Sequence, residues 1–247
     1  MASTDDLHSL TRAFSGLGVD EKALISLLGR SHSDHRRQLR KVSRDFFTED
    51  ERQFERWNER HILQLRQEFL RVKEAIVLYL MHPWERDARL IKEALHKDIQ
   101  YSVLIEVAGT RSSEELLGAR RAYHSLFERS IEEDVLFHIR GPYAKLFLGL
   151  LSSYRYEGPK VNEESAKSEA KSISEAVKGA SPHGKVLIEA EDIVRILSTR
   201  SKPHLKVVYH HYKEITGHNL DEDLASDAHL KEAVQCLITP RTYFVEV

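Results

Sequence analysis

The chain has 247 residues, 41% of them apolar, which is enough to bury a sizeable core. Its formal net charge of −2 excludes a strong overall attraction to nucleic acid or to an anionic surface, so such binding would need a local patch or a bridging cation. The lone cysteine, Cys236, excludes an internal disulfide, as in a reducing cytosol. The longest apolar run, residues 75–81, is too short to span a bilayer, and residues 1–10 lack the apolar core of a secretory signal. We therefore expect a soluble intracellular protein.

A glycine-containing turn stands between the first two predicted helices. Apolar residues recur at helical spacing over residues 7–14 and again over residues 24–28. Between them, Gly16 and Gly18 allow backbone angles that other residues resist, and Asp20 begins the second helix. Several carbonyl oxygens can converge in such a turn, and a Ca²⁺ ion takes about six to eight oxygen ligands. The alternative is a plain connector between two helices.

A short segment then recurs three times along the chain, as Gly-Arg-Ser at residues 29–31 and as Thr-Arg-Ser at residues 110–112 and 199–201. Twelve residues after each arginine stand Val42, Tyr123 and Tyr212. An acidic segment follows at the same offset in the second and third copies, at residues 131–135 and 220–224. Agreement at several offsets predicts an all-α fold of tandem modules, each of about five short helices that bury their apolar faces against their neighbours.

Proline and polar connectors set the expected boundaries of these modules. Pro83 follows the last helix of the first copy, a Glu/Lys/Ser-rich connector separates the second from the third, and Pro240 ends the third. We predict modules at residues 1–82, 83–160 and 161–240, with residues 241–247 as the start of another helix.

The chain resembles an annexin, and a plant annexin in particular. The resemblance is carried by Gly-Leu-Gly-Val-Asp-Glu at 16–21, Pro-Trp-Glu-Arg-Asp-Ala at 83–88, the Thr-Arg-Ser segments and Gly-Ala-Arg-Arg-Ala-Tyr at 118–123. It implies tandem five-helix modules in a right-handed superhelix. It also implies a cytoplasmic protein without enzymatic activity that binds acidic phospholipid membranes peripherally through Ca²⁺.

The resemblance places the calcium site in the first module. The metal ligands are the carbonyls of Phe14, Gly16 and Gly18, capped by the carboxylate of Glu68. Glu68 lies later in the chain than the family pattern has it, which is consistent with an insertion around residues 48–60, and Val19 stands where the family has threonine.

The other two modules depart from the family pattern. We expect no calcium in the second, whose turn at residues 96–101 has no glycine, and none in the third, whose turn spans residues 179–185. Asp223 or Asp227 could cap a degenerate third site. A fourth module, which annexins usually have, is missing, so we expect an uncovered apolar face and possible self-association.

Two further groups of charged residues each allow a functional and a structural interpretation. Arg36, Arg40 and Arg44 share a helix face that could touch anionic lipid or nucleic acid, although a solvated face is the plainer interpretation. Asp87, Glu106 and Arg111 match a polar cluster between annexin modules, read either as an ion path or as an ion-pair network.

Enzymatic function finds little support in the sequence. His32 and His35 resemble residues behind suggestions of peroxidase activity in plant annexins, but a haem ligand needs an apolar pocket that a charged helix does not offer. Two functions remain, a calcium-dependent membrane-binding protein and a calcium-independent helical-repeat scaffold for protein interactions.

Overall fold

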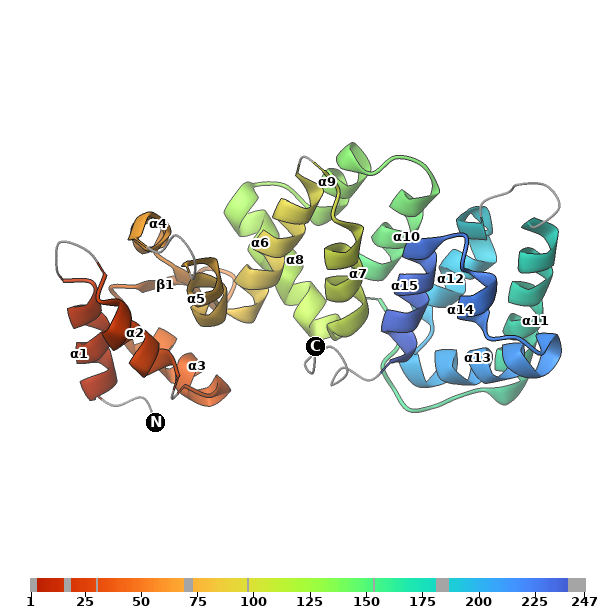
Figure 1. Cartoon of the computed structure of the whole chain (residues 1–247), viewed down its shortest axis with the longest axis horizontal. Coiled ribbons are helices and arrows are strands. Elements are labelled where there is room, and N and C mark those ends of the chain that lie inside the picture. Colours follow the sequence, from red (N-terminus) through yellow and green to blue (C-terminus); the bar gives the residue numbers. More distant parts are fainter. Residues whose placement is uncertain are drawn as a thin grey trace. The chain divides into compact units, whose positions relative to one another are not determined.

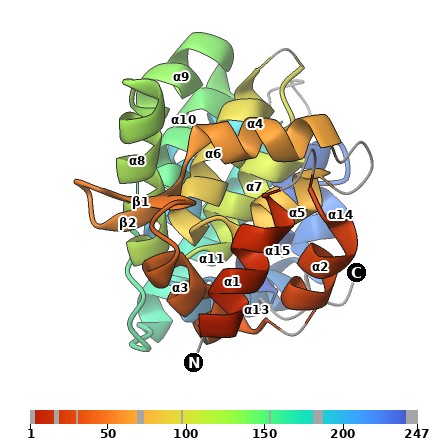
Figure 2. The same cartoon turned by 90° about the vertical axis from the view of Figure 1, so that its left-hand side faces the viewer.

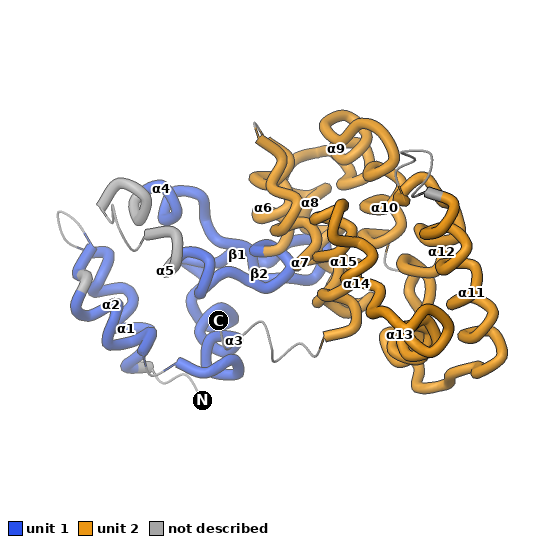
Figure 3. The backbone as a smooth tube through the Cα atoms, turned by 45° about the vertical axis from the view of Figure 1, so that its right-hand side comes forward, with its two compact units in different colours: residues 1–86 blue, residues 87–247 orange. Residues whose placement is uncertain are grey.

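The computed structural model describes residues 4–15, 19–29, 31–68, 73–96, 98–152, 154–180 and 187–239. These residues are mostly helical and fall into two compact units, residues 1–86 and 87–247, coloured separately in Figure 3. Each unit is treated by itself below. Across the described residues, no helix combines the length and the apolar character that a membrane span requires.

Unit 1 is built from short helices interrupted by a β-hairpin, as Figure 1 shows. Its elements are α1 (Thr4–Ala13), α2 (Glu21–Leu28), α3 (Ser33–Val42), β1 (Phe47–Asp50), β2 (Phe54–Trp57), α4 (Glu59–Glu68), α5 (Lys73–Leu80) and the first turn of α6 (Pro83–Leu95). The core contains Leu10, Leu24, Leu39, Ile62 and Leu80, all fully buried. One apolar position from each of five helices therefore meets at the centre.

The hairpin was not foreseen as a pair of strands; the sequence indicated only an insertion near it. Strands β1 and β2 pair antiparallel, with Phe47 opposite Trp57, and Gln53 adopts a positive φ of 68° in the connection. Phe47, Phe54 and Trp57 are all buried, and the rings of Phe47 and Trp57 lie 4.4 Å apart. These aromatic side chains make the hairpin part of the core of unit 1 rather than a surface loop.

Unit 2 contains two successive sets of five α-helices (Figures 1 and 2). The first set comprises α6, α7 (Tyr101–Thr110), α8 (Ser113–Phe127), α9 (Ile131–His138) and α10 (Pro142–Leu151). The second comprises α11 (Glu163–Ala180), α12 (Glu191–Thr199), α13 (Lys202–Thr216), α14 (Leu220–Asp223) and α15 (Ala228–Ile238), with a short 3-10 helix η1 (Leu187–Glu189) before α12.

This helix order confirms the predicted all-α modular fold. The predicted module boundaries stay predictions, and residues 241–247 lie outside the described part of the chain.

The recurring Arg-Ser segments have the same structural role in both sets of unit 2. The serine caps the following helix: Ser112 accepts a hydrogen bond from the Glu115 amide, and Ser201 accepts one from the His204 amide. The arginine reaches back to a carboxylate on the first helix of its own set. A repeated tripeptide therefore fixes both the start of one helix and its distance from another.

Those two arginine–carboxylate pairs are short and partly buried. Arg111 donates to both oxygens of Asp87 at 2.7 and 2.9 Å, and Arg200 donates twice to one oxygen of Glu169 at 2.8 and 2.6 Å. Burial alone would raise the pKa of Glu169, but hydrogen bonds from Arg200 and His204 outweigh it and hold that pKa below its usual value.

The tyrosine and the acidic segment that recur downstream also meet. The Tyr123 hydroxyl donates to Asp134, and the Tyr212 hydroxyl donates to Asp223 at 2.6 Å. Both tyrosines are fully buried, and burial together with the adjacent carboxylate raises the pKa of each phenol. In unit 1 the same offset holds Val42, which is 45% exposed and makes no such bond.

Candidate functional site

The turn that follows α1 is fixed at both ends. The amide of Asp20 donates to the carbonyl of Ala13 at 2.8 Å, which closes the turn. The Asp20 carboxylate then accepts from the Ala23 amide at 3.0 Å and caps α2. These two bonds therefore hold the ends of the turn, Ala13 and Asp20, close together.

Helix α4 lies against the first residue of this turn. The ring of Phe14 is 5.0 Å from that of Phe46 and 5.6 Å from the imidazole of His61, which belongs to α4. Burial and the nearby Arg60 lower the pKa of His61, so its ring is held neutral as part of this aromatic contact. The contact brings the helix that ends in Glu68 next to the candidate turn.

The predicted calcium ligands are only partly covered by the structure. Phe14 is described, whereas Gly16 and Gly18 lie outside the described residues. Glu68 is the last residue of α4, but the placement of its side chain lies outside the description. It stands seven residues beyond His61, about 10 Å further along the helix axis. The complete ligand set therefore stays a prediction.

The first set of helices in unit 2, which is the second predicted module, repeats the closure of the turn but has no glycine in it. The Gln100 amide donates to the Ala94 carbonyl at 2.9 Å, as Asp20 does to Ala13, but across a stretch one residue shorter. No glycine stands between these two residues.

Aromatic side chains pack beside this shorter turn. The ring of Tyr101 lies 5.6 Å from Tyr143 at the start of α10 and 4.4 Å from His229 in α15. The rings of Tyr101, Tyr143 and His229 therefore pack together next to the end of this turn. That this module binds no calcium stays a prediction.

The candidate acids of the third module are engaged elsewhere. Asp223 accepts from Tyr212, as described above. Asp227 caps α15 by accepting from the Leu230 amide at 3.0 Å, and it also accepts from the Tyr143 hydroxyl. Both of these bonds use Oδ1 of Asp227, whose Oδ2 is buried without a hydrogen-bond partner among the described residues. More widely, the described part of the chain holds no group of three or more His, Cys, Asp or Glu side chains that could bind a metal ion.

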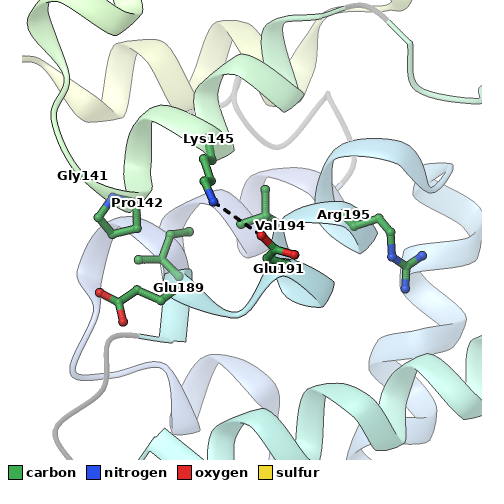
Figure 4. A pocket seen from close by; sticks show the side chains of 8 residues that line it. Gly141, Pro142, Lys145, Glu189, Glu191, Val194 and Arg195 are labelled. Atoms are coloured by element: carbon green, nitrogen blue, oxygen red, sulfur yellow. Dashed lines mark ion pairs between the residues drawn. The ribbon is translucent and has the colours of Figure 1, made fainter.

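A surface pocket of about 460 Å³ lies between the start of α10 and the segment from η1 to α12 (Figure 4). The Lys145 ammonium faces the Glu191 carboxylate at 3.6 Å, whereas Arg195 points away from them and pairs with Asp192 at 3.1 Å. Glu189 contributes a second carboxylate to the wall. Because two cations and two carboxylates offset one another, the pocket does not favour ligands of either charge.

The arginine face predicted on α3 is not uniformly solvated, and the prediction is wrong for Arg40. This residue is only 7% exposed and pairs with Glu55 of the hairpin at 3.4 Å. Arg36 lies over the ring of Tyr79 at 4.1 Å and donates to its hydroxyl at 2.6 Å. The face was misjudged because its partners come from β2 and α5, which are distant in sequence.

The remaining polar candidates also have structural partners. Arg111 and Asp87 form the ion pair described above, and Glu106 adds to the field that raises the Arg111 pKa against the opposing effect of burial. The ion-pair reading of this cluster therefore holds. His35 is hydrogen-bonded at Nδ1 to Ser31 and at Nε2 to Asp6, both at 3.0 Å, so neither ring nitrogen is directed at an empty pocket.

Comparisons with known proteins agree on one family. A family model described as Annexin matches residues 86–150 and 168–237. The chain is 50% identical to Annexin D4 of Arabidopsis thaliana over 252 residues, which cover 100% of this chain and 78% of that protein. It is 36% identical to Annexin Gh1 of Gossypium hirsutum over 256 residues, covering 99% of this chain and 75% of that protein.

Solved structures show the same fold at low sequence identity. The chain is similar to annexin III with a TM-score of 0.77 at 22% identity, over 94% of this chain and 70% of that one. It is also similar to chicken annexin V in complex with Zn²⁺, with a TM-score of 0.76 at 22% identity, over 98% of this chain and 74% of that one.

Proposed function

The chain belongs to the annexin family, and from this premise we propose that it binds acidic phospholipid membranes through a calcium ion held in its first module. The proposed ligands are the carbonyl oxygens of Phe14, Gly16 and Gly18 and the carboxylate of Glu68. All four donors are hard oxygens, which is the ligand chemistry that Ca²⁺ prefers.

The observation that carries the proposal is the closed turn between α1 and α2. Its ends are joined by the bond from Asp20 to Ala13, and helix α4 contacts its first residue through the ring pair of His61 and Phe14. Because the ends of the loop are already joined, that part of the entropy cost of binding an ion does not arise on binding. The equivalent turn in the second module is a residue shorter and lacks glycine, so the first module is the favoured place.

Three carbonyls and one carboxylate leave coordination positions open on a cation that takes about six to eight oxygens. A headgroup phosphate or carboxylate oxygen can occupy them, so that the ion joins an acidic protein group to an acidic lipid that would otherwise repel it. The role of this chain's residues is to hold the oxygens in place and to leave one side of the ion accessible. Leu17, between the two glycines, is predicted either to enter the interface or to pack within the loop.

A calcium-independent protein-interaction scaffold is the second candidate. It is favoured by the second and third modules, where aromatic packing and engaged carboxylates replace free ligands. Annexins as a family are membrane-binding proteins rather than enzymes, and we propose the same for this chain, with a cytoplasmic, peripheral location.

Sedimentation with vesicles separates the two functions. Vesicles containing phosphatidylserine should carry the wild-type chain into the pellet with calcium and release it with a chelator. Glu68→Gln should lower the calcium sensitivity about tenfold or more, because it removes the one charged ligand. Glu49→Gln, an exposed acid on β1 of the same unit, is the matched control and should behave as wild type. Sedimentation that ignores the chelator, or no sedimentation at all, would favour the scaffold.

A further inference from the structure

Helix α9 ends in two adjacent large apolar side chains that face solvent. Leu136 is 59% exposed and Phe137 is 68% exposed. Among the described aliphatic and phenylalanine side chains that are large and exposed, no others reach these values. Exposing two large apolar side chains to water is unfavourable in free energy, so adjacent exposed residues of this kind indicate a binding surface.

The core of unit 2 does not need these two residues. The inward positions of α9 are filled by Ile131 and Val135, both buried, and Ile139 closes the helix end with 1% exposure. Asp134, on the same inward side, accepts hydrogen bonds from Lys92 and Tyr123. The buried face of α9 is therefore filled by other residues, and Leu136 and Phe137 take no part in the core of unit 2.

Helix α9, which carries the pair, lies at the end of unit 2 that has the turn equivalent to the candidate calcium loop. Figures 1 and 2 both show α9 and the connection from α6 to α7 at the same end of this unit. That connection contains Gln100, whose amide repeats the closure seen at Asp20. The apolar pair thus belongs to a helix at the same end of the unit as a turn that has no glycine.

Positive charge borders the pair. The guanidinium of Arg129 lies 5.8 Å from the centre of the Phe137 ring and pairs with the buried Asp134 carboxylate at 2.7 Å. Arg140 follows as an exposed residue with no acid of the described residues within ion-pair distance. Glu133, one turn earlier, and Glu128, next to Arg129 in the chain, are exposed acids, while Glu132 pairs with Arg120. Two exposed apolar side chains followed by the exposed Arg140 suit the interface of an anionic bilayer, where the apolar side chains enter the acyl boundary and the guanidinium of Arg140 meets headgroups.

A protein partner fits this surface less well. A stable protein interface buries about 800 Å² on each side, which two side chains cannot supply. A bilayer needs no complementary shape, and it gains from each inserted side chain separately.

We propose that Leu136 and Phe137 form a membrane anchor that inserts into anionic bilayers without a calcium ion of its own, in the module that has lost its calcium ligands. The inference rests on the proposed membrane function but not on the identity of the calcium ligands. In this arrangement the ion in the first module provides calcium dependence, and the apolar pair adds affinity once the chain has reached the surface.

The first test measures insertion directly. Both tryptophans of the chain, Trp57 and Trp84, lie in unit 1, so Phe137→Trp adds a reporter to unit 2. With phosphatidylserine vesicles and calcium, its emission, taken as the difference from wild type, should shift to the blue and be quenched by lipids brominated in the acyl chain. Emission that stays water-like while the protein is fully bound would overturn the proposal.

The second test measures affinity. The double variant Leu136→Gln/Phe137→Gln should bind these vesicles about tenfold or more weakly at saturating calcium, from the loss of two inserted side chains. Calcium binding without lipid should be unchanged. Leu117→Gln is the matched control. Leu117 is also an exposed leucine, at 41%, but it lies near the start of α8, and α8 begins at the end of α7 that is far from the turn.

The outcomes of the second test separate the two proposals. Equal binding of the double variant and wild type, or equal losses in the double variant and the control, would overturn the anchor alone. Failure of the wild-type chain to bind vesicles at all would overturn the proposed membrane function together with it.

Discussion

The two units arrange similar short helices but hold them together differently. In unit 2, each set uses a buried tyrosine–aspartate bond and an arginine–carboxylate pair, and each pair of residues recurs at a fixed offset. In unit 1, the tyrosine position is Val42, and a hairpin carrying Phe47, Phe54 and Trp57 enters the core instead. Aromatic burial can thus take the place of a repeated polar contact while the helix order stays the same.

The largest effect is expected from removing the hairpin's main core residue. Trp57→Ala should destabilise unit 1 by about 3–5 kcal/mol, because it leaves a large cavity. Urea unfolding followed by the remaining tryptophan, Trp84, which lies in the first turn of α6 within unit 1, measures this loss. Trp57→Phe is the matched variant: it keeps a ring and removes an indole N–H that has no partner among the described residues, so its loss should be below about 1.5 kcal/mol. Equal losses would mean that ring packing is not what holds the hairpin.

A second difference between the units is acid sensitivity near pH 6. Burial, with smaller effects from Arg40 and Arg86, lowers the pKa of His82 in unit 1 to about 4. Its Nδ1 accepts a hydrogen bond from the Trp84 amide at 3.2 Å, and Glu55 approaches Nε2 at 4.0 Å. Between about pH 6.5 and pH 4 the unfolded chain binds the extra proton, so stability falls as pH falls.

The expected loss for unit 1 is about 2 kcal/mol on going from about pH 7.5 to about pH 5. Tryptophan-monitored urea unfolding at the two pH values measures it, and His82→Gln should remove most of the difference. A pH dependence that persists in this variant would assign the effect to other groups.

The smallest effect is expected from the repeated bonds of unit 2. Tyr123→Phe and Tyr212→Phe should each cost about 1–2 kcal/mol, because each leaves a carboxylate without its phenol donor. Circular dichroism should show the shift in helix unfolding while the tryptophan signal of unit 1 stays in place. Tyr154→Phe, at an 82% exposed position, is the control and should be neutral. A shift of the tryptophan transition would show that the two units do not unfold separately.

The sequence predicted the structural features that recur between modules, but it did not predict the hairpin, which occurs in one module. The offsets of Tyr123 and Tyr212 indicated the module, and each of these residues meets the acidic segment that recurs beyond it. The hairpin occurs once, so no internal comparison indicated it. The only local signal was a polar turn at residues 50–53 between aromatic residues.

That omission had a consequence for Arg40. Its partner Glu55 arrives with the second strand of the hairpin, so a helix-face pattern alone could not show that the guanidinium is buried. The candidate calcium turn was recognised from its glycines, and the structure added the closing bond of Asp20 and the ring contact with His61. The contact between Phe14 and His61 could not be predicted, because a helical pattern does not specify contacts between helices that are far apart in sequence.

Calcium titration calorimetry on the whole chain tests the proposed function most directly. The proposal predicts one binding event in the wild-type chain that Glu68→Gln weakens about tenfold or more, while Asp227→Asn, which alters a carboxylate already engaged as a cap, leaves it unchanged. Heat that is absent from the wild-type titration, or that is lost in Asp227→Asn and kept in Glu68→Gln, would contradict a calcium site in the first module.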